Sequence, residues 1–179
     1  MRVSPLLLSL CAGLWLAGPA IAAPADELPV PRVLTLAPGL SQHHAAPLVL
    51  AARRYAGFWN SGDPALAAQA LAPDFQDRTL PPGRAQGPSG PLQASAGFRQ
   101  AVPDLSAEID EMIVAADRVI LRLSFHGHFS GSFGAVQGHG QDVAFRAIDI
   151  YRVADGRITD NWHLEDNLAL LQQMEAIGK

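Results

Sequence analysis

The sequence predicts an α+β fold, because helical patterns come first and a run of antiparallel strands follows. Apolar residues recur at helical spacing between positions 48 and 102, and from position 105 they alternate with polar residues. A chain of 179 residues, of which 49% are hydrophobic, suits one packed domain. We therefore expect helices on one face of a curved antiparallel sheet, with a pocket at the open end of the resulting cone.

The N-terminal region is expected to lie outside this domain. Arg2 precedes the apolar run Pro5–Ile21, and Ala20-Ile21-Ala22 has the small residues of a signal-peptide cleavage site. We expect residues 1–22 to be a signal peptide cut near Ala22, with no stable membrane anchor and with export to the periplasm or the medium. Five prolines predict that residues 23–47 form an extended leader, so the domain spans residues 48–179.

The helical part of the domain is predicted to hold three helices. An apolar stripe from Leu48 to Trp59 marks the first, which Asn60-Ser61-Gly62 ends. Asp63-Pro64 is typical of a helix start, because Asp accepts hydrogen bonds from free amides and Pro fits the first turn. After a long loop rich in Pro and Gly, Ser89 or Gly90 begins the third helix. Such a loop in a compact domain is often functional.

The strands follow in order. Alternation predicts strands from Leu105 and from Val119, then Asp142–Val153 and Arg157–Leu164, and a closing helix that includes Leu168 and Met174. Asp155-Gly156 between the last two strands is a strong hairpin turn. The net charge is −4 and no Lys/Arg cluster occurs, so nucleic acid and anionic membranes are not expected partners.

Four segments of the sequence resemble a known family. They read YAGFWNSGD, AVPDL, DRVILRLSFHGHFSG and DIYRVADGRITDNWHLEDNLALLQQM. From Leu48 to Met174 the chain resembles the SnoaL-like polyketide cyclases, or ester cyclases, of the NTF2-like superfamily. The resemblance implies a cystatin-like cone and an intramolecular aldol condensation in which a pocket Asp is the general acid/base, without metal or cofactor. It also implies a small, oxygenated, largely apolar ligand, and a homodimer formed through the open sheet face.

By this resemblance, Asp166 of the W-x-x-x-D pattern is the expected acid/base, with His128 as its catalytic partner. A second interpretation makes Asp166 the N-cap of the closing helix. The two roles conflict, because capping lowers the pKa that general-base catalysis needs raised. The residues expected to bind substrate are Trp59, Asn60, Arg122, His126, Asp149 and Trp162.

Several of these residues have plainer interpretations. Asn60 can simply end a helix, and Arg122 can pair with an acid. His126 and His128 share one strand face at a spacing compatible with a metal ion, but we expect no metal site. The Asp-His pair that family members often carry after the second helix is Asp77-Arg78 here. A non-catalytic ligand-binding protein, or a hydrolase or isomerase on the same fold, therefore remains an alternative.

Overall fold

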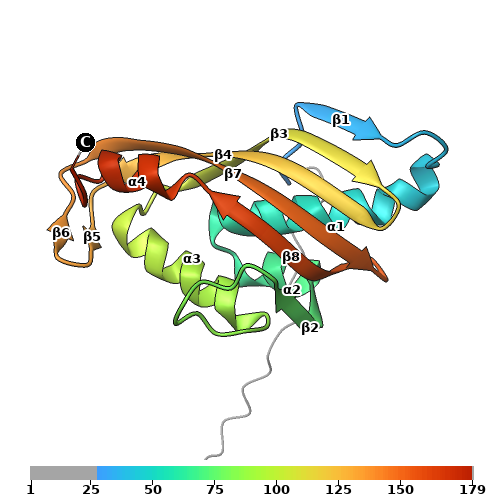
Figure 1. Ribbon diagram of the computed structural model, residues 1–179, viewed down its shortest axis with the longest axis horizontal. Helices are drawn as coiled ribbons and strands as arrows, with labels where there is room; N and C mark the ends of the chain where they lie inside the picture. The colour runs from blue at the N-terminus through green and yellow to red at the C-terminus, as the bar shows by residue number, and fades with distance from the viewer. Residues whose placement is uncertain (1–27, 179) are drawn as a thin grey trace, which may run out of the picture.

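The computed structural model describes residues 28–178, and in this range a six-stranded sheet curves over a layer of helices (Figure 1). The strand order is β1-β3-β4-β7-β8-β2, in which β1 and β2 are parallel to their neighbours and the four central strands are antiparallel. The six strands are β1 Val33–Leu36, β2 Leu71–Asp77, β3 Ser106–Ala115, β4 Arg118–Phe129, β7 Gln141–Ala154 and β8 Arg157–Glu165.

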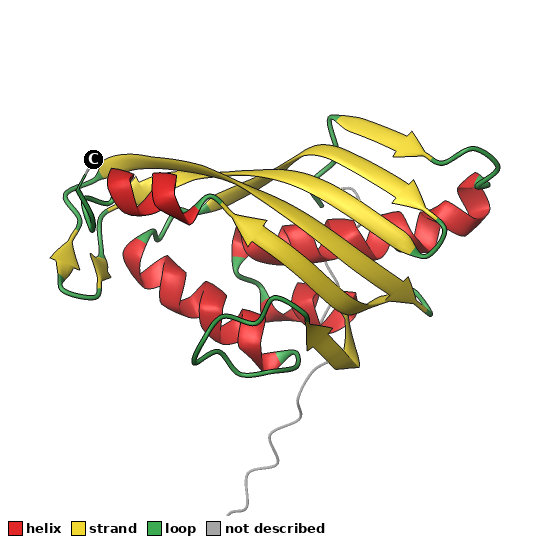
Figure 2. Cartoon of the chain, in the orientation of Figure 1, coloured by secondary structure: helices red, strands yellow, loops and turns green. Residues whose placement is uncertain are grey.

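The helices are α1 Gln42–Ser61, α2 Pro64–Ala70, α3 Ser89–Ala101 and α4 Asn167–Gln173, and α1 to α3 lie on one side of the sheet (Figure 2). Asp63 caps α2 as predicted, since its Oδ1 accepts a hydrogen bond from Ala65 N at 2.9 Å. Gly62 ends α1 with a φ of 77°, a conformation that glycine adopts without strain. None of the described helices is long and apolar enough to span a membrane.

The segment before Leu48 differs from the expected leader. Its described part contributes β1, which pairs with β3, and α1 already begins at Gln42 with Ser41 as its N-cap. Pro47, which suggested a boundary, lies inside α1. The predicted signal peptide, residues 1–22, lies outside the described residues.

The core lies between α1 and the concave face of the sheet. Tyr55 and Phe58 of α1 are 2% and 1% exposed, and the Tyr55 ring meets Tyr151 of β7 edge to face at 5.6 Å. On β7 the buried positions alternate with exposed ones, so Ala147, Asp149 and Tyr151 all face inward. An acidic residue in this inward row is unusual and indicates a functional position.

A β-bulge sets which residues of β8 face inward. Val153 pairs with Ile158, but Arg152 pairs with Asp160, so one residue of β8 is skipped and Asp149 lies opposite His163. Asp160 is held at this point by Arg78 and Arg152, whose Nε atoms lie 2.7 Å from its oxygens. Because side chains alternate along a strand, the bulge turns His163 inward and Trp162 outward.

Candidate functional site

A cavity of about 460 Å³ lies between the concave face of the sheet and helices α1, α3 and α4. Most of its wall is apolar, and its polar side chains gather at the end formed by β2, β7 and β8. The polar residues of that end are Asp77, Arg84, Asp149, Asn161, His163 and Glu165. An apolar cavity with a few convergent polar groups is the usual form of a small-molecule site.

Four aromatic rings build a continuous wall of the cavity. Phe125 and Phe145 stack with centroids 4.8 Å apart, and Trp59 meets Phe125 edge to face at 6.5 Å. Phe98 of α3 meets Phe145 in the same way at 5.8 Å. Because the rings pack against one another, the wall is rigid and suits a flat or apolar ligand.

Asp149 is a carboxyl group in the cavity wall with only 5% of its surface exposed. Its Oδ2 accepts a hydrogen bond from the Tyr151 hydroxyl at 2.7 Å, and the Asn161 amide is a further neutral donor. Burial raises the pKa of Asp149 to about 6, although these donors and the charge of His163 oppose the shift. A carboxyl with such a pKa gains and loses a proton near neutral pH.

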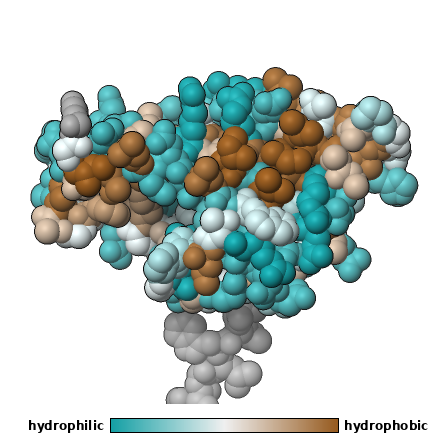
Figure 3. Space-filling model, viewed as in Figure 1, coloured by the Kyte–Doolittle hydropathy of each residue, from teal (hydrophilic) through white to brown (hydrophobic). Residues whose placement is uncertain are grey.

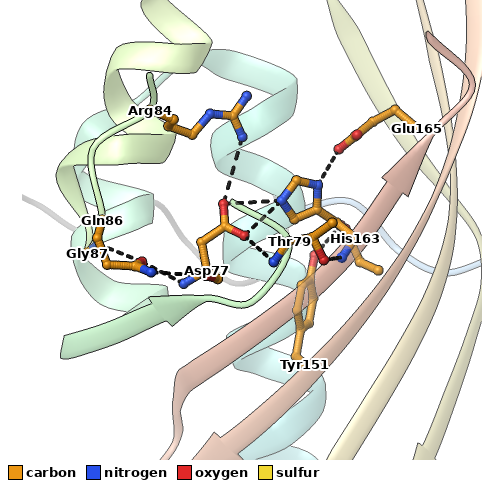
Figure 4. Close-up of polar contacts among 9 residues, drawn as sticks. Asp77, Thr79, Arg84, Gln86, Gly87, Tyr151, His163 and Glu165 are labelled. Carbon is orange, nitrogen blue, oxygen red and sulfur yellow. Dashed lines mark hydrogen bonds and ion pairs between the residues drawn. The ribbon is translucent and has the colours of Figure 1, made fainter. Parts of the chain in front are cut away.

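His163 lies directly across from Asp149 and is held between two carboxylates (Figure 4). Its Nδ1 is 2.7 Å from Oε1 of Glu165, and its Nε2 is 3.1 Å from Oδ1 of Asp77. Burial alone would lower the pKa of His163, but the hydrogen bond to Glu165 and the charges of both acids raise it to about 9. The same contact keeps the pKa of Glu165 below its usual value, against the effect of burial. His163 is therefore a fixed cation at neutral pH.

Asp77 is positioned by the loop of residues 78–88. Its Oδ1 accepts a hydrogen bond from Thr79 N at 2.9 Å, and its backbone N–H and C=O both bond the side chain of Gln86. Thr79 in turn accepts a hydrogen bond from His163 N at 3.1 Å. The long loop therefore fixes one end of the Asp77–His163–Glu165 row.

Two of the predicted site residues lie at the cavity, Trp59 in the aromatic wall and Asp149 at the polar end. Asp166 does not line it. Its exposed side chain caps α4, where Oδ1 accepts a hydrogen bond from Ala169 N at 3.0 Å. The N-cap interpretation of Asp166 is therefore the right one, and the structure does not support its prediction as a pocket acid/base.

The other predicted residues also lie elsewhere. Arg122 is on the outer face of the sheet, where it pairs with Asp110 at 3.3 Å, as its plainer interpretation expected. Asn60 accepts a hydrogen bond from Ala107 N, and Trp162 is 37% exposed on the outer face below Arg118. His126 and His128 are exposed. Among residues 28–178 no three His, Cys, Asp or Glu side chains form a group that could hold a metal ion.

Sequence reasoning missed Asp77, Arg84, His163 and Glu165 as site residues. The turn at Asp155-Gly156 predicts a regular hairpin in which Asp149 faces Trp162, and the bulge shifts this pairing by one residue. One signal was available, because Asp160-Asn161 breaks the alternation that follows Ile158.

Comparisons with known proteins agree with this architecture. A candidate polyketide cyclase from Bacillus cereus ATCC 10987 is 42% identical, with a TM-score of 0.77 over 86% of this chain and 97% of its own. IdmH, a candidate polyketide cyclase from Streptomyces antibioticus, is 26% identical, with a TM-score of 0.62 over 70% of this chain and 98% of its own. No curated protein sequence matches significantly.

A protein of Catenulispora acidiphila DSM 44928 with a ketosteroid isomerase-like fold is 18% identical, with a TM-score of 0.56 over 70% of this chain and 92% of its own. This likeness concerns the fold alone and confirms the expected NTF2-like cone. The family model of the SnoaL-like polyketide cyclases matches residues 49–174, which include all three strands of the polar end of the cavity. The chain therefore belongs to the SnoaL-like polyketide cyclase family.

Proposed function

We propose that this protein is an ester cyclase-type enzyme that removes a proton next to a carbonyl group of a small, largely apolar substrate. The observation that carries the proposal is Asp149, a buried carboxyl in the cavity wall whose hydrogen-bond donors are neutral and whose pKa is raised to about 6. It takes over the role expected of Asp166. A base of this kind needs neither metal nor cofactor for a carbon acid that is already activated by two carbonyls.

The proposed cycle moves one proton through Asp149. The carboxylate takes a proton from the carbon between two carbonyls, and the resulting enolate carbon attacks a second carbonyl of the same molecule. A carbon–carbon bond forms, the attacked carbonyl becomes an alkoxide, and Asp149 returns its proton to that oxygen. The aromatic wall supports the proposal, because it can hold a folded, ring-forming substrate against β7.

His163 contributes charge to this cycle rather than a free base. Both of its ring nitrogens face carboxylates, so the ring cannot take a proton from a substrate while it stays charged. Its positive charge, directly across from Asp149, favours the ionised form of that carboxyl. We expect kcat/KM to rise through about pH 6, as Asp149 ionises, and to fall above about pH 9, as His163 loses its proton.

Deuterium exchange tests the proposal without knowledge of the natural substrate. Ethyl benzoylacetate in D₂O is followed by proton NMR, with the exchange in buffer subtracted. The native protein is expected to accelerate exchange of the protons between the carbonyls, and Asp149→Asn to reduce the acceleration about 100-fold or more. Asp166→Asn is the control and should keep it. Equal acceleration by Asp149→Asn and the native protein would refute the role of Asp149.

A second candidate function is binding without turnover. It is favoured by the location of Asp166, because the residue that the resemblance implied as catalytic is a solvent-exposed helix cap. Native mass spectrometry of protein purified from its own host distinguishes the two. A ligand that is released unchanged, together with no exchange above buffer, would support the binding protein.

The export prediction remains part of the proposal. It rests on the apolar run Pro5–Ile21 and the small residues that end at Ala22. N-terminal sequencing of the mature protein should give Ala23 as the first residue, in the periplasmic fraction or the medium. A chain that keeps Met1 and stays with the cytoplasmic fraction would contradict export.

We also propose that two copies associate through the outer face of the sheet. Ile148 lies across from Leu164 and Ile150 across from Trp162, and all four are at least 37% exposed. Figure 3 shows hydrophobic residues gathered on the sheet side of the molecule. Large exposed apolar patches are typical of interfaces. Light scattering should give the mass of a dimer for the native protein and of a monomer for Leu164→Glu, and a native monomer at every concentration would contradict the proposal.

A further inference from the structure

Arg84 is a cation of the cavity wall whose guanidinium forms no hydrogen bond with any of residues 28–178. It lies on the loop of residues 78–88 and its side chain is 28% exposed. Among the described residues it forms one ion pair, with Asp77, whose Oδ2 lies 3.9 Å from its Nη1, which is too long for a hydrogen bond. Its charge also acts on Glu165. Figure 4 shows its guanidinium pointing toward the Asp77 carboxylate, which His163 also approaches.

Neither Asp77 nor the loop needs this guanidinium. Asp77 is already bonded by Thr79 N and faces the charged ring of His163, and Gln86 ties the loop to the backbone of Asp77 with two hydrogen bonds. By contrast, Arg78 and Arg152 each bond Asp160 at 2.7 Å. A guanidinium in a cavity with unused donors is suited to an oxygen atom of a ligand.

The other charges of the cavity determine which kind of ligand oxygen Arg84 can bind. With Asp149 ionised, the polar end holds three carboxylates, on Asp77, Asp149 and Glu165, against the two cations Arg84 and His163. The net charge is therefore negative, and a carboxylate ligand would be repelled at short range. An uncharged carbonyl oxygen accepts the same hydrogen bonds without this repulsion.

We propose that Arg84 is the residue that determines substrate specificity, by binding an uncharged carbonyl oxygen whose aryl or alkyl body lies on the wall of Trp59, Phe98, Phe125 and Phe145. The ligands selected are neutral ketones and esters with an apolar ring, in preference to carboxylates of the same shape. The inference rests on the cavity of the proposed function, but it concerns binding and not proton transfer.

A matched set of naphthalene probes tests the inference by calorimetry. The probes are 2-acetonaphthone, which is a neutral ketone, and 2-naphthoate, which has the same ring with a carboxylate. The native protein is expected to bind the ketone at least tenfold more tightly than the carboxylate. Arg84→Gln should weaken ketone binding about tenfold, because one charge-assisted hydrogen bond is replaced by a neutral one. Arg84→Lys should fall in between, since it keeps the charge without the planar fork.

Arg146→Gln is the matched control, because Arg146 is exposed on β7 outside the cavity. It should leave both affinities unchanged, and thermal melting confirms that each variant is folded. Three results would overturn the inference: unchanged ketone affinity in Arg84→Gln, tighter native binding of 2-naphthoate than of the ketone, or no native binding of either probe.

Asp149→Asn separates this inference from the proposed function. It should bind 2-acetonaphthone at least as well as the native protein does, while losing the acceleration of deuterium exchange. If exchange persists and Arg84→Gln has no effect on binding, only the role of Arg84 fails. If Arg84-dependent binding persists without any exchange in the native protein, only the catalytic proposal fails.

Discussion

Two histidines of this protein are each held between two carboxylates, one inside the cavity and one outside. His163 lies between Glu165 and Asp77 with its side chain 6% exposed. His128 lies between Asp104 and Asp142, at 2.5 and 3.2 Å, with its side chain 58% exposed. The hydrogen bond to Asp104 raises the pKa of His128, so both rings favour the charged form.

The two clusters differ in how well water can stabilise their carboxylates when the imidazole ring is removed. If the outer ring is lost, Asp104 and Asp142 are solvated at once, since exposed ion pairs contribute little. If the inner ring is lost, two carboxylates remain beside the buried Asp149 with less water to stabilise them. The same arrangement of side chains therefore contributes little to the stability of the protein at the surface and much more in the cavity.

The largest expected effect comes from removing the inner ring. His163→Ala should lower the free energy of unfolding by about 3 kcal/mol at pH 7, at the low end for a broken buried pair because Glu165 is partly hydrated. His128→Ala should leave the denaturant midpoint unchanged. Urea unfolding of both variants measures the contrast, and equal midpoints would remove the distinction between the two clusters.

The next effect concerns the carboxyl opposite His163. Because the pKa of Asp149 is raised on folding, ionising it costs stability, which is lost as the pH rises through about 6. Asp149→Asn should therefore be more stable than the native protein by about 2 kcal/mol at pH 8 and equally stable at pH 4. Asn161 can turn its buried, unpaired Oδ1 toward the new amide. A variant less stable at pH 8 would contradict the burial cost.

A smaller effect is expected on raising the pH. The folded pKa of His163, about 9, is higher than its unfolded value, so its stabilisation is complete below about pH 6.5 and is lost through pH 9. The melting temperature should fall by a few degrees between pH 7 and pH 9.5. His163→Asn should flatten this dependence, whereas His128→Asn should retain it.

The smallest effect is that of the helix cap. Asp166→Ala removes the acceptor for Ala169 N and should cost about 1 kcal/mol. It should leave the deuterium exchange of ethyl benzoylacetate unchanged. A loss of exchange with no loss of stability would return the acid/base role to Asp166.

The helices and the four antiparallel strands could be predicted from the sequence, because alternation and turn residues are local signals. The two parallel edge strands, β1 and β2, were not among the predicted strands. The hairpin at Asp155-Gly156 and the cap at Asp63 lie where they were expected. β1 was missed because Val33–Leu36 is short and lies at the sheet edge, where pairing with β3 decides its structure. Such pairing depends on residues distant in the sequence, so a four-residue pattern alone cannot predict it.

The site could be predicted only in part. Asp149 was recognisable because Asp is unfavourable in the middle of a strand, so its presence there indicates a particular role. His163 and Trp162 are neighbours in β8 and so lie on opposite faces, but which of those two faces is inward depends on a skipped residue. Arg84 lies on a loop with no periodicity, so only its position in the fold shows that it reaches the cavity.

The bulge in β8 also bears on how such a cavity changes over evolution. If the bulge were lost and Thr159 paired with Arg152, the regular hairpin would bring Trp162 inward across from Asp149 and turn His163 to the outer face. A shift of the β8 register by one residue thus exchanges an imidazolium for an indole at the same place in the cavity. The ion pairs of Asp160 with Arg78 and Arg152 hold the bulge from both sides, so they preserve the chemistry of the cavity without touching it.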